Sequence, residues 1–198
     1  GQACTASKRF IVVDAVYQEF LGKFTASMAA IHAADPTDPD TFLGPLSSEA
    51  TLEDLAELVD DAIAKGATVA TGGHRLDGPG AYYPPTVLTG VTPQMRAYSE
   101  ELFGPAAVVY RVPSADSAVD LANASPFGLA GTVFSDDLDK AKKLAERLDT
   151  GMVWINSTSR SAPDLPFGGV KRSGVGRELA KFGINEFANK KLIRTPQL

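Results

Sequence analysis

Residues 106–156 read AAVVYRVPSADSAVDLANASPFGLAGTVFSDDLDKAKKLAERLDTGMVWIN, and this stretch decides the fold class. Short apolar, β-branched runs predict buried strands, and the segments between them have the three-to-four-residue apolar spacing of amphipathic helices. The predicted strands are 106–112, 131–134 and 152–156, and the predicted helices are 116–122 and 138–148. Strands that alternate with helices are typical of a parallel sheet with right-handed crossovers. We therefore expect an α/β fold with an open, mostly parallel, doubly wound sheet and helices on both faces.

The preceding part of the chain begins with the same strand-to-helix pattern. The run RFIVV at 9–13 predicts a strand, and Asp14 is placed to cap a helix whose apolar residues follow at three-to-four-residue intervals. A second helix is expected after the pair Ser47-Ser48, with Gly66 as its stop. Together with the alternation downstream, these elements extend the α/β pattern over most of the chain.

The last part of the chain is less regular. Residues 157–176 are rich in Gly, Ser and Pro, and a loop of this length is often functional. A short helix is expected over 177–182, followed by a strand over 187–194 that has no partner further along the chain. An unpaired terminal strand is suited to pairing with another chain. We therefore divide the protein into a catalytic domain, 1–184, and an oligomerisation tail, 185–198.

The composition excludes several classes of protein. The chain has 198 residues, 44% of them hydrophobic, and a formal net charge of −5. Its scattered basic residues do not form the concentrated basic face that nucleic-acid binding requires, and no apolar run is long enough to span a membrane. One cysteine allows no internal disulfide, and no Cys/His spacing indicates a metal site. A reducing, cytoplasmic location fits this cysteine usage.

Cys4, in the opening sequence GQAC, is the first candidate for chemistry. A single cysteine is usually an inert, buried residue. A reactive thiol needs a neighbouring positive charge, helix N-terminus or base, and no base is identifiable close to Cys4 in the sequence. Considered alone, Cys4 therefore favours no particular function.

The segment EELFGP at 100–105 is the second candidate. Its two carboxylates precede a predicted strand, which places an acidic side chain at the edge of the sheet where ligands of α/β proteins tend to bind. A solvated acidic turn is the simpler interpretation. A carboxylate at Glu101 can, however, accept both hydroxyls of a ribose, and the ring of Phe103 can pack on a flat cofactor ring.

The segment PFGGVKRSGVGRE at 166–178 is the third candidate. It contains a G-x-G pattern, but no βαβ unit surrounds it, so it is a poor dinucleotide-binding motif. We expect its glycines instead to permit a tightly packed backbone that positions Phe167.

Together with the run GLAGTVFS at 128–135, these motifs resemble, in order and spacing, the catalytic half of NAD(P)-dependent aldehyde dehydrogenases. The resemblance extends from residue 1 to about residue 195. Within the family, the loop DPTDPD at 35–40 and the segment SRSAPDLPFGG at 159–169 look most like bacterial succinate-semialdehyde dehydrogenases.

The resemblance implies a role for each motif. Cys4 matches the nucleophile that attacks the aldehyde and forms first a thiohemiacetal and then a thioester. Glu101 matches the carboxylate that holds the nicotinamide ribose of NAD or NADP, and Phe103 matches the ring beside the nicotinamide. Phe167 matches an aromatic wall of the substrate tunnel. The reaction implied is oxidation of an aldehyde to the carboxylic acid.

Ser161 stands where semialdehyde enzymes of the family tend to have serine, and Arg160 precedes it. A hydroxyl and a guanidinium would suit a substrate that ends in a carboxylate, such as succinate semialdehyde. The family's cofactor-binding half, with its general-base glutamate and oxyanion asparagine, has no counterpart in these 198 residues. We therefore expect the chain alone to be inactive, and the whole enzyme to be a homodimer or homotetramer.

Two alternatives remain at this stage. Cys4 could serve an acyl transferase or hydrolase, which would require His32 or His74 beside the sulfur as a base. The chain could also be a non-catalytic oligomerisation module that docks through its terminal strand.

Overall fold

The computed structural model describes residues 1–196, and the chain forms two compact units, Gly1–Ser125 and Pro126–Leu198. The α/β class with mostly parallel strand pairing is confirmed in these units. Among the described residues, no helix is both long enough and apolar enough to cross a membrane.

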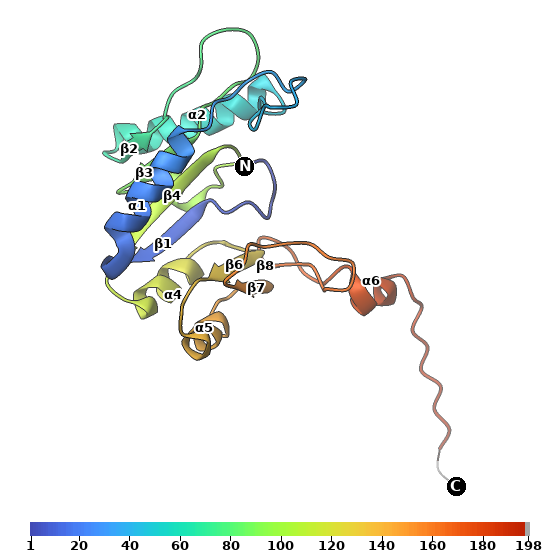
Figure 1. Ribbon diagram of the computed structural model, residues 1–198. Coiled ribbons are helices and arrows are strands. Elements are labelled where there is room, and N and C mark those ends of the chain that lie inside the picture. Colours follow the sequence, from blue (N-terminus) through green and yellow to red (C-terminus); the bar gives the residue numbers. More distant parts are fainter. Residues whose placement is uncertain (197–198) are drawn as a thin grey trace. The chain divides into compact units, whose positions relative to one another are not determined.

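The first unit is built on a four-stranded sheet with the order β1-β4-β3-β2 (Figure 1). Its strands are β1 (Arg9–Val13), β2 (Thr68–Thr71), β3 (Thr86–Thr89) and β4 (Ala106–Val112). Its helices are α1 (Asp14–Ala29), α2 (Glu49–Ala64), α3 (Arg96–Ser99) and α4 (Ala115–Asn123). Strand β4 runs parallel to both β1 and β3, whereas β2 is antiparallel to β3. The predicted strands 9–13 and 106–112 are thus neighbours in the sheet.

Both faces of this sheet are covered, and β4 shows why. Successive side chains of a strand point to opposite faces. Val109 belongs to the apolar cluster that includes Tyr17 of α1, whereas Val108 belongs to the larger cluster that includes Leu55 and Val59 of α2. A strand buried on both faces is expected to be apolar along its length, and the first five residues of β4, 106–110, are all buried and carry no charge. The sheet therefore lies between α1 and α2 (Figure 1).

The helix boundaries confirm the predicted start of α2 and correct the predicted cap of α1. Helix α2 follows the pair Ser47-Ser48 as expected, and Ser48 caps it, because its Oγ accepts a hydrogen bond from the Thr51 N–H at 3.2 Å. Asp14 does not cap α1: it is the first helical residue, and Val13 at the N-cap makes no side-chain capping bond. The Asp14 carboxylate instead accepts a hydrogen bond from Arg111 Nε of β4 at 2.8 Å. A partner distant in the sequence thus determines the role of Asp14.

Part of the apolar core comes from the Gly- and Pro-rich loop between β2 and β3. Ala81 and Tyr83 are buried, and both belong to the larger apolar cluster. The Leu46 N–H also donates to the Ala81 carbonyl at 2.8 Å. The Gly- and Pro-rich composition alone indicates a solvated loop. Its last residues, however, pack in the core beside Leu46, in the segment that leads into α2.

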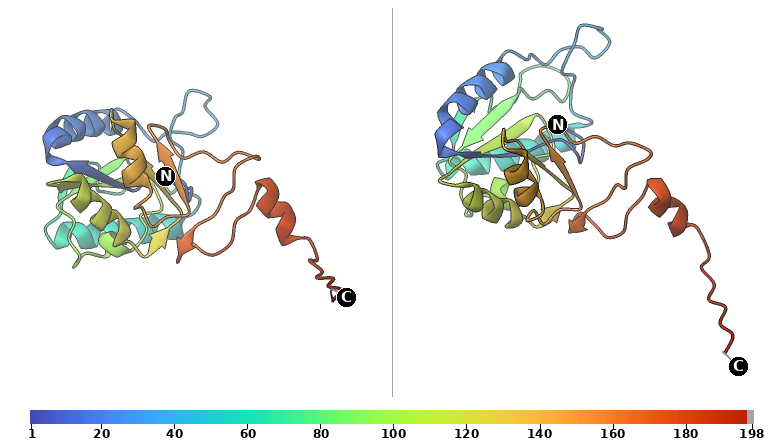
Figure 2. Two further views of the ribbon diagram at one scale, coloured as in Figure 1. Left: turned by 90° about the horizontal axis from the view of Figure 1, so that it is seen from below. Right: turned by 60° about the horizontal axis from the view of Figure 1, so that its bottom comes forward.

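The second unit contains two small sheets. Its strands are β5 (Phe127–Gly128), β6 (Ala130–Val133), β7 (Met152–Ile155) and β8 (Val170–Lys171), and its helices are α5 (Leu138–Ala145) and α6 (Ala180–Glu186). Strands β6 and β7 are parallel, and α5 packs against both of them (Figure 2). Strands β5 and β8 are antiparallel. The Asp137 side chain caps α5 by accepting a hydrogen bond from the Lys140 N–H at 2.9 Å.

The C-terminal helix is displaced from its predicted position. Glu178 is paired with Phe167 in a β-bridge, and Leu179 has φ 62°, so α6 begins only at Ala180 rather than at 177. The segment 187–194 forms no strand with the rest of the described chain. Its pairing with another chain, within the tail 185–198, therefore stays a prediction, and residues 197–198 of that tail lie outside the described residues.

Candidate active site

Cys4 lies at the tip of a β-turn. The Ala6 N–H donates to the Ala3 carbonyl at 3.0 Å, so Cys4 and Thr5 are the two central residues of this turn. Cys4 itself is exposed. The turn therefore presents the thiol to solvent, which suits a nucleophile better than the buried position that a single cysteine usually occupies.

The turn, called here the Cys4 turn (residues 3–6), is anchored by the two residues before it. Gln2 Oε1 accepts a hydrogen bond from the Ser47 N–H at 2.9 Å, and Gln2 Nε2 donates to Ser47 Oγ at 3.2 Å. Gly1 packs on the backbone of Gly104 so closely that a Cβ at residue 1 would overlap the Gly104 carbonyl. The motifs GQAC and EELFGP, far apart in sequence, are therefore packed together.

Lys8 is a residue of this site that sequence reasoning missed. Its Nζ donates to the Ala3 carbonyl at 2.9 Å and to the Ala6 carbonyl at 3.0 Å, and it lies 3.2 Å from Glu101 Oε1. The same ammonium lies 5.0 Å from the centroid of the Phe103 ring, within range of a cation–π interaction. The available sequence signal was a lysine four positions after the only cysteine.

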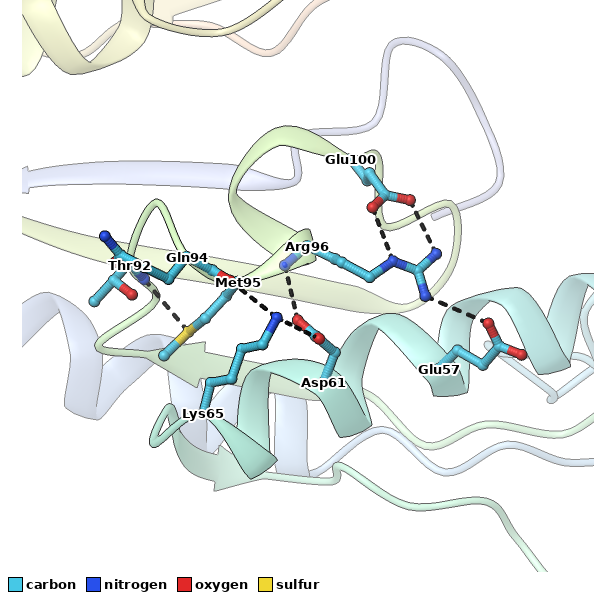
Figure 3. Close-up of polar contacts among 8 residues, drawn as sticks. All are labelled: Glu57, Asp61, Lys65, Thr92, Gln94, Met95, Arg96 and Glu100. Carbon is cyan, nitrogen blue, oxygen red and sulfur yellow. Dashed lines mark hydrogen bonds and ion pairs between the residues drawn. The ribbon is translucent and has the colours of Figure 1, made fainter.

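The two carboxylates of EELFGP have different partners. Arg96 Nε and Nη2 donate to the two carboxylate oxygens of Glu100 at 2.8 and 3.0 Å, and Arg96 Nη1 donates to Glu57 of α2 at 3.4 Å (Figure 3). The hydrogen bonds from Arg96 hold the pKa of the Glu100 carboxyl below its ordinary value. Glu100 is thus bound on the α2 side, whereas Glu101 faces Lys8 and keeps a side chain that is 37% exposed.

A second set of contacts fixes the chain just before this pair. Asp61 near the end of α2 accepts a hydrogen bond from the Arg96 N–H at 2.8 Å and forms an ion pair with Lys65 at 2.6 Å (Figure 3). Lys65 also donates to the Gln94 carbonyl at 2.9 Å. The hydrogen bond from Lys65, followed by that from the Arg96 backbone, lowers the pKa of Asp61. Segment 94–100 is therefore held on α2 at several points.

The site lies at the amino ends of β1 and β4. This corrects the expectation that Glu101 lies at the edge of the sheet where ligands of α/β proteins usually bind. Ligands of doubly wound proteins usually bind beyond the carboxyl ends of the strands. The Cys4 turn precedes β1 and Glu101 precedes β4, so both lie at the opposite end of these parallel strands. The parallel pairing of β1 and β4 is what brings the two leading segments together.

In the second unit, the glycine-rich segment 168–177 forms a loop closed at its base by Phe167 and Glu178. Their backbones exchange two hydrogen bonds, of 2.9 and 2.8 Å. Within the loop, a Cβ at Gly168 would meet the Gly176 carbonyl at 2.6 Å, and the φ of Gly168 is 154°. The glycines thus allow close backbone packing, and Phe167 is held at the base of the loop with its side chain half-buried.

The predicted site residues fall into two groups. Cys4, Glu101 and Phe103 lie around Lys8 in the first unit. The other three lie in the second unit: Phe167 at the base of the glycine-rich loop, and Arg160 and Ser161 in an exposed loop after β7. Across residues 1–196, no group of three or more His, Cys, Asp or Glu side chains is arranged to hold a metal ion.

The fold and these motifs define a class of enzyme. The model of the aldehyde dehydrogenase family matches residues 1–193, and the chain belongs to this family. Over 194 residues it is 62% identical to a succinate-semialdehyde dehydrogenase [NADP(+)] of Deinococcus radiodurans, covering 98% of this chain and 41% of that protein. It is 49% identical over 193 residues to succinate-semialdehyde dehydrogenase [NADP(+)] 1 of Mycobacterium tuberculosis, covering 98% of this chain and 42% of that protein. The chain thus spans about two fifths of the length of these relatives.

The solved structures that match this chain are also aldehyde dehydrogenases, and their names give different aldehydes as substrates. Succinic semialdehyde dehydrogenase from Streptococcus pyogenes, in complex with NADP+, matches with a TM-score of 0.95 and 43% identity, over 100% of this chain and 43% of that one. An apo betaine aldehyde dehydrogenase from Staphylococcus aureus matches with a TM-score of 0.93 and 38% identity, over 100% of this chain and 41% of that one. The fold alone therefore does not fix the aldehyde.

Proposed function

We propose that this chain supplies the catalytic part of an NAD(P)-dependent aldehyde dehydrogenase that oxidises succinate semialdehyde to succinate. The observation that carries the proposal is the exposed Cys4 at the tip of its turn, with Glu101 and Phe103 joined to that turn by Lys8. The substrate is proposed from the relatives, because the chain is 62% identical to the Deinococcus radiodurans enzyme.

The proposed chemistry begins at sulfur. The Cys4 thiolate adds to the aldehyde carbon, so that a C–S bond forms and the carbonyl oxygen takes the charge. Bound NAD(P)+ supplies the acceptor for the hydride that leaves this carbon. The thioester left on Cys4 is then hydrolysed by water, which releases the carboxylic acid and returns the thiol.

The residues present fit the nicotinamide end of the dinucleotide. The side chain of Glu101 is 37% exposed, so its carboxylate can still accept hydrogen bonds from ribose hydroxyls. Phe103 is also 37% exposed and offers a ring against which a flat group can pack. We propose that both residues hold this end of the cofactor.

The remaining assignments concern the second unit and the tail. We propose that Phe167 lines the substrate tunnel and that Ser161 and Arg160 bind the substrate's distal carboxylate, through a hydroxyl and a guanidinium respectively. Residues 1–184 act as the catalytic domain in this proposal. Residues 185–198 form the tail through which the full-length protein assembles as a homodimer or homotetramer.

The proposal is tested with a chimera in which this chain replaces the segment of the Deinococcus radiodurans relative that it matches. We expect the chimera to reduce NADP+ in the presence of succinate semialdehyde, and the 198-residue chain alone to show no turnover. A chimera that folds and binds NADP+ but oxidises no aldehyde would contradict the proposal. Comparison with betaine aldehyde in the same assay tests the substrate: a preference for betaine aldehyde would overturn that part.

A further inference from the structure

The ammonium of Lys8 connects the two halves of the proposed site within the first unit. Its three oxygen contacts are the carbonyls of Ala3 and Ala6, at 2.9 and 3.0 Å, and Glu101 Oε1 at 3.2 Å. Two of the three N–H donors of the ammonium are used in the hydrogen bonds to the carbonyls, and the carboxylate of Glu101 forms an ion pair with the same group. The side chain of Lys8 is only 10% exposed. A charge so shielded from water is stable only with such partners.

The backbone of Lys8 is fixed as well. Its carbonyl accepts a hydrogen bond from the Val108 N–H at 2.8 Å, which ties the residue to β4 immediately before β1 begins. Because both the backbone and the ammonium of Lys8 are bound, the side chain has little conformational freedom. Its ammonium therefore keeps the carbonyls of Ala3 and Ala6 and the carboxylate of Glu101 in place.

We propose that Lys8 is a positioning residue that, through one ammonium, fixes both the Cys4 turn and the carboxylate of Glu101. This inference rests on the proposed function, because it assigns to Lys8 the task of holding the turn of the nucleophile and the cofactor-binding carboxylate of Glu101 in one arrangement. Two consequences follow. Without Lys8 the carbonyls of the turn lose a shared donor, so the turn opens more often. Glu101 also loses the charge that orients it, so the dinucleotide binds more weakly.

The coupling to Glu101 is tested in the chimera with Lys8→Met, Glu101→Gln and the double variant. Lys8→Met is expected to raise the KM for the dinucleotide about tenfold, within the range of measured couplings between contacting residues. In the Glu101→Gln background the same lysine replacement should change this KM by less than about twofold, since the residue through which it acts is gone. Equal fold-changes in both backgrounds, or an unchanged KM in Lys8→Met, would overturn the inference.

Two further variants guard against a purely structural explanation. Lys8→Arg keeps the charge and is expected to restore part of the dinucleotide KM, although its planar fork cannot reproduce all three contacts. Should Lys8→Met not fold, Lys8→Gln, which also removes the charge, takes its place in the cycle with Glu101→Gln, and additivity there would equally refute the coupling. Lys23→Met removes a lysine from an ion pair on α1, where the Lys23 side chain is 77% exposed, and is the matched control expected to leave the KM unchanged.

The effect on the turn is measured without any turnover, on the 198-residue chain. The Ala6 N–H, which donates to the Ala3 carbonyl, should exchange with deuterium about tenfold faster in Lys8→Met than in the parent or in Lys23→Met. An unchanged Ala6 exchange rate contradicts the inference even if the chimera is active. Faster exchange together with an inactive parent chimera supports the positioning of the turn and places the failure in the proposed function.

Discussion

Gly104 offers a sharp test of how the site is packed. It is buried at the end of the EELFGP motif, and a Cβ built there would overlap Leu55 Cδ2 and lie 3.3 Å from Leu46 Cδ2. Its φ is not in the left-handed region, so the effect of Gly104→Ala is steric. Leu55 is 2% exposed and cannot swing into solvent. Forcing one methyl group into such a core costs about 1–3 kcal/mol, so we expect Gly104→Ala to lower the free energy of unfolding by this amount.

A double-mutant cycle isolates the cause. Leu55→Ala alone should cost about 2–5 kcal/mol, because it removes a buried side chain and leaves a cavity. The cavity has room for the methyl group that Gly104→Ala adds, so the double variant should be about 1–2 kcal/mol more stable than the sum of the two single changes predicts. The assay is urea denaturation of the 198-residue chain followed by circular dichroism.

The matched control for this cycle is Gly22→Ala. Gly22 lies in α1, is exposed, and has nothing within 4 Å of an added Cβ. This change should stabilise the chain by about 0.5–1 kcal/mol, through helix propensity. A Gly104→Ala variant as stable as the parent, or a cycle that is additive within about 0.5 kcal/mol, would refute the packing argument.

Three other predictions concern charge, substrate and the alternative mechanism. In the folded chain, Lys65 and the Arg96 N–H lower the pKa of Asp61 below its ordinary value of 3.8. The stabilisation that the ionised Asp61 carboxylate contributes is therefore present above about pH 4 and is lost as the pH falls through the lower pKa of the folded chain. Asp61→Asn should therefore lose less stability than the parent between about pH 5 and pH 2, measured by urea denaturation at each pH; equal losses would show that these contacts do not stabilise the folded state. In the chimera, Ser161→Ala and Arg160→Met should each raise the KM for succinate semialdehyde about tenfold and leave the KM for an uncharged aldehyde unchanged. An equal rise in KM for both aldehydes would show that these residues do not bind the substrate's carboxylate. The double variant His32→Ala/His74→Ala should keep full turnover, whereas loss of activity with the fold intact would favour the histidine-assisted hydrolase or transferase.

The elements that the sequence predicts well are those with a local signal. The β-branched run 9–13 is β1, and the apolar spacing after the pair Ser47-Ser48 is α2. In each case the residues that decide the structure are neighbours in the sequence. The helix predicted at 177–182 lacked such a signal, and its start is set instead by the pairing of Glu178 with Phe167.

The candidate site was only partly predictable for the same reason. Cys4 and Glu101 could be chosen from their motifs, but the ammonium that joins them comes from Lys8, which no motif marks. The different partners of Glu100 and Glu101 also depend on Arg96 and on parallel strand pairing, which periodicity does not report. Long-range contacts of this kind are visible only in the folded chain.

The role of Cys4 as the nucleophile is tested most directly by looking for the acyl group on its sulfur. The chimera is mixed with succinate semialdehyde and NADP+, quenched in acid during turnover, digested and examined by mass spectrometry. We expect a succinyl thioester on the peptide that contains Cys4, and neither adduct nor turnover in the Cys4→Ala variant. Turnover that persists in Cys4→Ala would contradict the assignment of Cys4 as the nucleophile.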